Sequence, residues 1–188
     1  MDTLFPLEPV FPPGFLYLPD FLSVEEEAHL LQTISKIELK TFNFHGYEAR
    51  RNVASFGAGW SFSKQAVSIG PDIPPDFDKL LQKIAEQLKV SKDAFGQLLV
   101  TEYPPGSVIN WHRDAPPYDF IVGISLNADC IFRLRPHDKR KQGRKSIISF
   151  NVSRGSMYVM KGISRSDWEH STAPVKQTRY SITLRTLR

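Results

Sequence analysis

Residues 101–114, TEYPPGSVINWHRD, end in a histidine and an aspartate two positions apart. Successive side chains of an extended strand point to opposite faces, so His112 and Asp114 are expected to project the same way and to meet one cation. His170, in the later motif WEH, is a candidate for a third ligand. Two imidazoles and one carboxylate form the set that leaves coordination positions open on Fe(II). The sequence therefore predicts a metal site, although an H-x-D pair alone is equally typical of a structural or surface pair.

The last candidate strand, residues 179–185, reads RYSITLR and alternates polar and apolar side chains. A period of two places Arg179, Ser181, Thr183 and Arg185 on one face of that strand. Guanidinium groups donate paired hydrogen bonds that fit carboxylates, so two arginines on one face after His170 predict a site for an organic acid. The alternative is a pair of solvated charges on a terminal strand.

In this order, TEYPPG, HRD, the histidine of DWEHS and the closing RYSITLR resemble the AlkB family of 2-oxoglutarate- and Fe(II)-dependent dioxygenases. The resemblance covers roughly residues 100–185. It implies an enzyme that uses Fe(II), 2-oxoglutarate as cosubstrate and O2. The implied catalytic residues are also the metal ligands: His112, Asp114 and His170.

The resemblance also implies how 2-oxoglutarate is held. Arg179 and Tyr103 would bind its far carboxylate, and Arg185 would lie near the carboxylate that chelates iron. Relatives usually have asparagine where this chain has Thr101 and Ser181. The complete set of implied cofactor-binding residues is Thr101, Tyr103, Arg179, Ser181, Thr183 and Arg185.

One position departs from the pattern of the repair members of this family. They often have a second acid two residues after the metal-binding aspartate, facing the exocyclic amine of the base, whereas this chain has Pro116 there. Asp119 is the candidate to replace that acid through a bend of the chain.

Two helices are predicted before these motifs. Ser23 and Glu26 form a capping-box pattern ahead of a helix, and Pro75 is suited to the first turn of a second helix that ends near Leu88. The first helix is expected to bury the apolar residues Ala28, Leu31, Ile34 and Ile37. Both helices are expected to pack against a sheet.

Short apolar or alternating runs, separated by turn residues, follow from residue 97 onward. They predict strands at 97–103, 120–126, 131–134, 146–150, 156–160 and 180–184. Strands that follow two helices indicate an α+β fold, a double-stranded β-helix (jelly roll) of two sheets with two supporting N-terminal helices. The resemblance to the AlkB family implies a nucleotide-recognition lid in addition. At 188 residues the chain has the length of one domain. We expect residues 1–188 to form a single AlkB-like dioxygenase domain, with an arm, helices and substrate lid in 1–95 and the jelly-roll catalytic core in 96–188.

Residues 42–62 are rich in aromatic residues, arginine and glycine. In AlkB relatives this region forms the nucleotide-recognition lid, so Phe56, Trp60 and Phe62 are candidates to stack on an everted base. Arg50 and Arg51 are candidates to contact phosphates. The alternative for the aromatic side chains is packing in a short hairpin under the sheet.

A second basic region lies at residues 133–145, which contain seven lysines and arginines and one acid. Either it is a solvated loop or it is an edge that faces phosphates, in which case Arg135 binds substrate.

Together these features predict oxidative demethylation of N-alkylated bases in DNA or RNA, as in direct-reversal DNA repair. Two alternatives stay open. One is hydroxylation or demethylation of a modified tRNA base, a protein or a small molecule, and the other is a non-catalytic jelly-roll module that binds nucleic acid.

Composition bounds the cellular context. A net charge of +4 is compatible with a polyanionic partner such as alkylated nucleic acid. The single cysteine, Cys130, excludes an intramolecular disulfide and is expected to be buried, which fits a reducing compartment. No signal sequence or long apolar run is present, so we expect a cytoplasmic monomer without a membrane partner.

Overall fold

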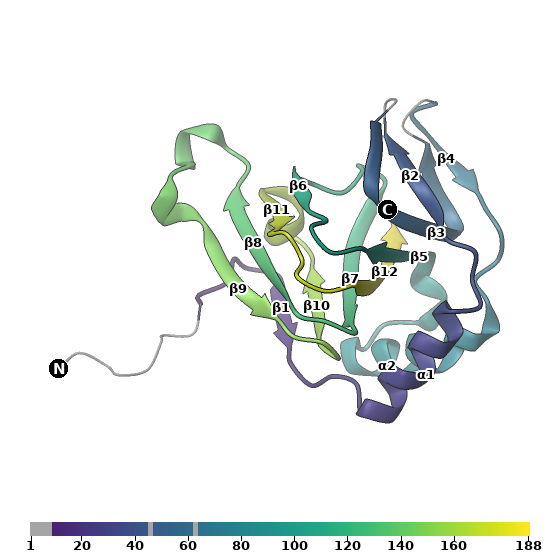
Figure 1. Ribbon diagram of the computed structural model, residues 1–188. Helices are drawn as coiled ribbons and strands as arrows, with labels where there is room; N and C mark the ends of the chain where they lie inside the picture. The colour runs from purple at the N-terminus through teal and green to yellow at the C-terminus, as the bar shows by residue number, and fades with distance from the viewer. Residues whose placement is uncertain (1–8, 45–46, 62–63) are drawn as a thin grey trace.

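The computed structural model describes residues 9–44, 47–61 and 64–188. In these residues the strands form two antiparallel sheets that face each other, with helices at the foot of the larger sheet (Figure 1). The larger sheet has the order β1 (Phe15–Leu18), β10 (Met157–Met160), β7 (Tyr118–Leu126), β12 (Arg179–Leu187), β5 (Phe95–Tyr103), β3 (Tyr47–Ser61) and β2 (Lys40–Phe44), and β4 (Ala66–Ile69) pairs with β3. The smaller sheet has the order β6 (Ile109–His112), β11 (Trp168–Thr172), β8 (Cys130–Pro136) and β9 (Ile148–Val152). The prediction of a jelly roll is confirmed.

Two hydrophobic clusters hold this arrangement together. One lies between the helices and the larger sheet and contains Leu81 and Ile84 together with Leu98 and Leu184. The other lies between the two sheets and contains Phe132 and Leu134 from one side and Tyr158 from the other. The larger sheet is therefore covered by the helices on one face and by the smaller sheet on the other, and it is the central layer of the molecule.

The first helix, α1 (Val24–Ile34), begins at the predicted capping box. The Glu26 amide donates to Ser23 Oγ at 3.2 Å, and the Ser23 amide donates to Glu26 Oε2 at 2.7 Å. Its buried face agrees with the prediction at Ile34, which is buried, and at Leu31 and Ile37, which pack half-buried against the cluster between the helices and the larger sheet. Ala28 is exposed instead, and the other buried residues of the helix are Glu27, Leu30 and Thr33. Glu27 accepts from Arg154, whose Nε lies 2.9 Å from its Oε2.

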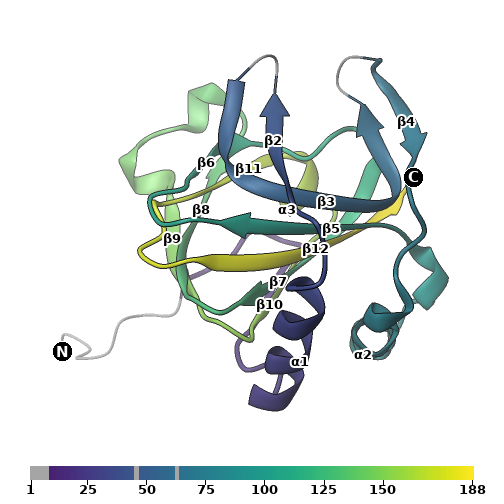
Figure 2. The same cartoon turned by 45° about the vertical axis from the view of Figure 1, so that its right-hand side comes forward.

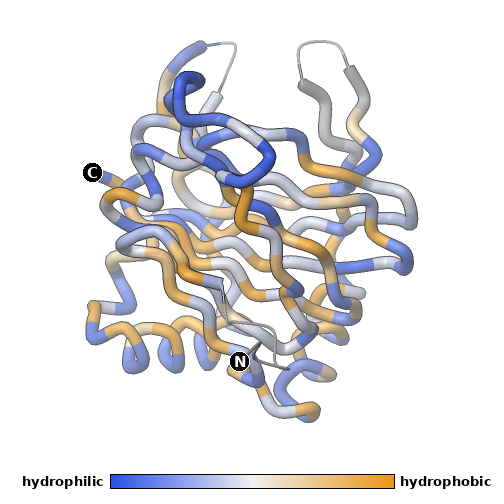
Figure 3. The backbone as a smooth tube through the Cα atoms, turned by 90° about the vertical axis from the view of Figure 1, so that its left-hand side faces the viewer, coloured by the Kyte–Doolittle hydropathy of each residue, from blue (hydrophilic) through white to orange (hydrophobic). Residues whose placement is uncertain are grey.

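The second helix has the predicted start and end. A 3-10 turn at Pro75–Phe77 leads into α2 (Asp78–Leu88), which buries Leu80, Leu81, Ile84 and Ala85. Hydrophilic and hydrophobic residues alternate along the helices at the foot of the molecule (Figure 3). Among the helices of the described residues, none is long and apolar enough to cross a bilayer.

The alternation predicted for residues 179–185 is present in β12, between β5 and β7. Ile182 and Leu184 face the helices and are fully buried. Arg179 and Arg185, on the opposite face, line the space between the sheets. The position of β12 in the middle of the larger sheet therefore directs both arginines into the interior.

The described part of residues 42–61 belongs to β2 and to the long strand β3, which pair with each other at the edge of the larger sheet. β3 pairs with β5 from Asn52 opposite Glu102 to Gly57 opposite Gln97, so it extends the larger sheet. Beyond that pairing the strand turns away from the sheet and rises toward β4 (Figure 2). Gly57 has φ +75°, and a Cβ there would lie 2.2 Å from the carbonyl oxygen of Gly96, so the bend requires glycine.

Candidate active site

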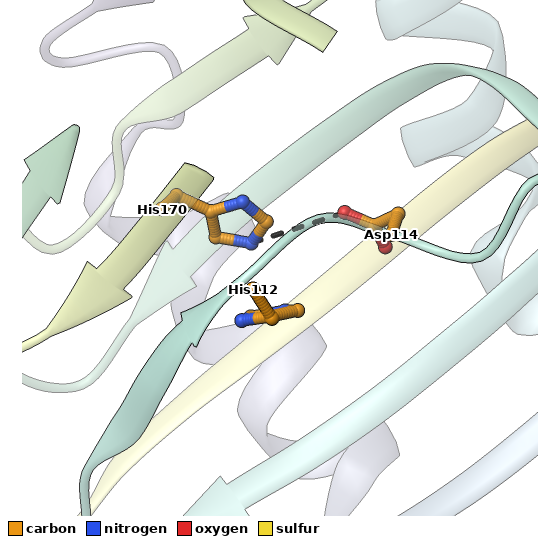
Figure 4. A group of neighbouring side chains, drawn as sticks. All are labelled: His112, Asp114 and His170. Carbon is orange, nitrogen blue, oxygen red and sulfur yellow. Dashed lines mark ion pairs between the residues drawn. The ribbon is translucent and has the colours of Figure 1, made fainter. Parts of the chain in front are cut away.

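Three side chains from different parts of the chain meet between the sheets. His112 ends β6, His170 lies in β11, and Asp114 follows in the irregular segment after β6. Their ligand atoms all lie within 4.8 Å of one another (Figure 4). The two histidines are direct partners across the antiparallel pair of β6 and β11, with ring centroids 4.2 Å apart. The predicted convergence is found, but strand alternation does not explain it, because the strand ends at His112 and Asp114 reaches the site from the segment beyond.

Charge fixes the protonation of these groups. Burial alone would raise the pKa of Asp114, but the charges of Arg185, His170 and His112 outweigh it and hold that pKa well below its usual range. Burial, followed by the charge of His112, lowers the pKa of His170 to about 3. At neutral pH the site therefore offers a carboxylate and a neutral imidazole, which are the protonation states that bind metal.

This donor set fits a divalent cation such as Fe(II). Two imidazoles and one carboxylate occupy one side of the ion and leave its other positions open. All three residues line one cavity of about 360 Å³, which leaves room beside them for a further ligand. Phe132 stacks on the His170 ring at 5.5 Å and holds it in place.

Arg179 lies on the same cavity as the three ligands. Its side chain is 2% exposed, its Nε donates to Ser125 Oγ at 2.9 Å, and its guanidinium lies 5.1 Å from the centre of the Tyr103 ring. Within the described residues no carboxylate lies within ion-pair distance of Arg179. Because burial of an unpaired charge is costly, this guanidinium is suited to a carboxylate of a ligand, as expected for 2-oxoglutarate.

The remaining predicted cofactor residues lie on β5 and β12 around Arg179. Thr101 and Thr183 line the cavity. Ser181 is buried and donates to the Tyr103 hydroxyl at 3.5 Å, so it supports Tyr103 and is not part of the cavity wall. Arg185 donates to Asp114 and to Gln97, which places it beside the metal ligands.

The residues predicted to bind substrate are separated by the fold. Arg51 and Trp60 line the cavity, and Arg50 is exposed beside Gly106 at its rim. Phe62 lies outside the described residues. Phe56 packs against the helix-side cluster, and Arg135 lies on the outer face of the smaller sheet, where Glu169 holds it at 2.6 Å.

One of those assignments is therefore corrected. Alternation in β3 turns Phe56 to the face opposite Arg51, so the alternative of core packing holds for this residue. Arg135 is turned away from the cavity, since its neighbour in β8 with the inward side chain is Leu134, so its contact with phosphates stays a prediction about the surface outside the cavity.

The proposed replacement for the second acid is also wrong. Asp119 lies in β7 with its side chain 61% exposed, 4.0 Å from Arg188, and does not line the cavity. Pro116 is exposed. Among the described residues Asp114 is the cavity's one carboxylate, and the polar groups on the substrate side are Ser55, Ser68 and Gln97.

Several residues of the site carried no recognisable sequence signal. Gln97 is the register partner of Arg185 and accepts from its Nη1 at 2.8 Å, while Ser125 fixes Arg179. Arg165, which follows β10 in a short helix α3 (Ile163–Ser166), donates to the carbonyls of Asp114, Ala115 and Tyr118. Gln97 and Ser125 are identified only by the pairing of β12 with β5 and β7.

Comparisons with known proteins agree with this geometry. Residues 14–186 match the sequence model of the 2OG-Fe(II) oxygenase superfamily. The chain is 27% identical over 176 residues to the tRNA (carboxymethyluridine(34)-5-O)-methyltransferase alkbh8 of Xenopus tropicalis, covering 90% of this chain and 27% of that protein. It is 27% identical over 188 residues to the RNA demethylase ALKBH5 of Bos taurus, covering 86% of this chain and 46% of that protein. The chain thus spans between a quarter and a half of these curated relatives.

Two solved structures share the fold. The structure of OsALKBH1 superposes with a TM-score of 0.72 at 16% identity, covering 94% of this chain and 98% of that one. A 2OG-Fe(II) oxygenase family oxidoreductase from Burkholderia pseudomallei superposes with a TM-score of 0.65 at 15% identity, covering 93% and 85%. At these identities the likeness concerns the arrangement of strands and helices.

Proposed function

The chain belongs to the 2OG-Fe(II) oxygenase superfamily, as a member of its AlkB family, and from this premise we propose that it is a dioxygenase that demethylates N-alkylated bases in nucleic acid. The observation that carries the proposal is one cavity lined both by the cluster of His112, Asp114 and His170 and by the buried, acid-free Arg179. A metal and a carboxylic acid would have separate places in the same cavity, beside the smaller sheet and beside β12 of the larger sheet. Residues 1–188 would act as one AlkB-like domain, with 96–188 as its catalytic core.

Each side of the cavity has a distinct task in this proposal. His112, Asp114 and His170 hold Fe(II), and Arg179 with Tyr103 binds the far carboxylate of 2-oxoglutarate. Fe(II), with 2-oxoglutarate and O2, supplies the oxidation of the alkyl C–H bond, while the cosubstrate is converted to succinate and carbon dioxide. Arg185 keeps Asp114 ionised and oriented.

The substrate side must place one base beside the metal. Trp60 and Tyr118 offer ring surfaces in the cavity, and Gln97 and Ser55 offer polar groups, joined by a hydrogen bond of 3.1 Å. A base reaches this depth only after leaving its stack, which costs a few kcal/mol and less in a single strand or where an alkyl group blocks pairing. A base that fills this cavity would displace water from it and so limit unproductive oxidation.

The substrate side does not provide the second carboxylate expected of repair members. With Asp119 outside the cavity, no acid other than Asp114 is available there among the described residues to accept from an exocyclic amine. This observation favours a second candidate substrate: a modified tRNA base without that amine. The proposed demethylation of nucleic acid includes both substrates, and DNA repair is the narrower proposal.

The compartment and assembly remain proposals as well. We propose a monomer in the cytoplasm, which the single buried thiol and the net charge of +4 suit.

A direct test uses anaerobically prepared protein loaded with Fe(II) and 2-oxoglutarate, then exposed to air with methylated DNA and RNA oligonucleotides. Mass spectrometry follows the loss of the methyl group, and succinate is measured in parallel. We expect demethylation of at least one oligonucleotide and none with His112→Ala. Succinate formation that responds to no alkylated oligonucleotide would point to a protein or small-molecule substrate, and the lack of metal binding would point to a non-catalytic module.

A further inference from the structure

The positive charge of the protein is concentrated in one segment. Residues 133–145, which we call the basic segment, carry seven lysines and arginines against one acid, a net charge of +6. The whole chain has a net charge of +4, so the other residues together carry −2. A uniform solvated surface would not produce this distribution, which indicates a surface for a polyanion.

The basic segment connects β8 to β9 through two 3-10 turns, Lys139–Lys141 and Arg144–Ser146. It projects from the body of the smaller sheet (Figure 1). Asp138 is engaged locally, since it accepts from the Arg140 amide at 3.0 Å and pairs with its guanidinium at 2.9 Å. Within the described residues the other cations of the turns have no ion-pair partner, and they are exposed: Lys139, Lys141, Arg144 and Lys145.

The base of the segment is held by several side-chain contacts. The guanidinium groups of Arg135 and Arg133 lie 4.4 Å and 5.2 Å from the centre of the Trp111 ring. Glu169 binds Arg135 at 2.6 Å and the His137 Nδ1 at 2.8 Å. The two guanidiniums cover the Trp111 ring, so this ring is not free to stack on a base. The outer face of the smaller sheet therefore offers positive charge, which suits phosphates.

The basic segment also lies close to the cavity. Glu169 immediately precedes the metal ligand His170, and the His137 amide donates to the Asp167 carbonyl at 2.7 Å. Arg113 lies between the basic segment and the cavity. It is exposed, lines the cavity and donates a hydrogen bond to the Ser166 carbonyl. Arg50 lies on the other side, in β3, and the β8–β9 connection lies toward the same end of the molecule as the labelled ends of β2 and β3 (Figure 1).

We propose that the basic segment binds the sugar–phosphate backbone of the strand whose modified base occupies the cavity. The inference rests on the proposed function and deepens it by naming where the polymer lies outside the active site. Contacts to phosphates carry no sequence information, so the segment contributes affinity without sequence preference. We favour a nucleic-acid strand over an anionic membrane because basic residues continue from the segment to the cavity. The nucleotide that carries the modified base must enter that cavity while the rest of its strand stays outside.

The test compares two variants with the same loss of charge. The first is Lys139→Gln/Lys141→Gln/Arg144→Gln/Lys145→Gln. The control replaces four exposed lysines on or near the helices and the foot of β2: Lys36→Gln/Lys40→Gln/Lys79→Gln/Lys89→Gln. The probe is an unmodified, fluorescein-labelled single-stranded 20-mer, as RNA and as DNA, and anisotropy is recorded at several salt concentrations.

We expect the first variant to weaken binding at low salt by at least about tenfold and the control to remain within about twofold of the wild type. For single strands each phosphate contact contributes about 0.7 to the slope of log Kd against log salt, so four lost contacts reduce that slope by about 3. Equal losses in both variants, or none in the first, would overturn the proposal. Retained oligonucleotide binding with lost binding to phosphatidylserine vesicles would assign the segment to a membrane instead.

A second measurement separates this proposal from the proposed function. Anisotropy with an unmodified oligonucleotide requires no turnover, and 2-oxoglutarate conversion with a free methylated nucleoside requires no backbone contact. If the first variant loses oligonucleotide binding while no substrate is demethylated, the surface stands and the proposed activity fails. If demethylation proceeds and binding is unchanged in the first variant, the activity stands and the surface fails.

Discussion

Arg185 and Asp114 form an ion pair in which a single carboxylate oxygen accepts both guanidinium contacts. Nε and Nη2 of Arg185 lie 2.8 Å and 2.7 Å from Oδ1 of Asp114. The other oxygen, Oδ2, lies 3.8 Å from Nε2 of His170. Oδ1 of Asp114 is therefore engaged by Arg185, and Oδ2 remains directed toward His170.

This arrangement predicts different consequences for two ligand variants. Asp114→Asn removes the buried partner of Arg185, so we expect loss of metal binding and a decrease of about 3 kcal/mol in the free energy of unfolding of the metal-free protein. His112→Gln should lose metal binding with little effect on the metal-free fold, because His112 has one hydrogen bond to the Asn110 carbonyl. Calorimetric titration with Mn(II) and urea unfolding provide the two measurements. Equal stability of the variants would contradict this account of Asp114.

Arg179→Gln is expected to act on the cosubstrate and not on the metal. The charge-assisted contact it removes is typically worth about 1.5–3 kcal/mol, so the Kd for 2-oxoglutarate should rise by about 10- to 150-fold. Titration of the Mn(II)-loaded protein with 2-oxoglutarate measures this change, and Mn(II) affinity itself is the control. Unchanged affinity for 2-oxoglutarate would show that Arg179 does not hold its carboxylate.

Arg165 is predicted to hold the segment that carries Asp114. Its Nη2 donates to the carbonyls of Ala115 at 2.8 Å and Tyr118 at 2.9 Å, and the side chain is 6% exposed. Arg165→Met leaves these carbonyls without donors, which costs about 1–3 kcal/mol of stability and should also weaken Mn(II) binding. Arg165→Lys keeps one donor and should recover part of both losses. Intact metal affinity in Arg165→Met would limit its role to stability.

Glu27 is predicted to fasten α1 to the β-sandwich. It is 3% exposed and accepts from the Asn127 amide at 2.7 Å and from Arg154. Glu27→Gln weakens hydrogen bonds to a charged group and should cost about 2 kcal/mol of stability. The matched control is Glu25→Gln, two residues earlier and exposed, which should cost about 0.5 kcal/mol or less. Denaturant unfolding of both variants tests the difference.

Cys130 is predicted to be chemically inert in the native protein. The thiol is 4% exposed, and burial raises its pKa, so little thiolate forms at pH 8. A thiol reagent such as iodoacetamide should modify it only after unfolding in guanidinium, as read by mass spectrometry. Rapid modification of the folded protein at pH 8 would show that this part of the sandwich opens.

Local sequence patterns predicted much of the frame. The capping box at Ser23 starts α1, Pro75 starts the turn into α2, and the period of two in β12 separates Arg179 from Ile182. These features depend on neighbours within a few residues along the chain. For that reason, a single sequence contains the information to predict them.

The smaller sheet and the extra strands of the larger one were harder to predict. β6 and β11 are short and both carry metal ligands; an extended chain was expected at His112 and Asp114 but ends at His112, and no strand was expected at His170. The region before residue 95 supplies β3, whose pairing with β5 joins residues between 40 (Gly57 and Gln97) and 50 (Asn52 and Glu102) positions apart. Such strands are stabilised by their partners, and their own residues carry weak signals.

By itself, the sequence determined which residue types are available and which of them share a face: two histidines and an aspartate in order, and two arginines in register along one strand. Only the tertiary structure decided what each face meets. In the folded chain Glu27 is buried beside Arg154, and Phe56 packs toward the helices. Arg135 forms an ion pair with Glu169, and Asp119 lies outside the cavity. The physical reason is that periodicity along a chain fixes the direction of a side chain relative to its neighbours, whereas burial and pairing depend on the element that packs opposite.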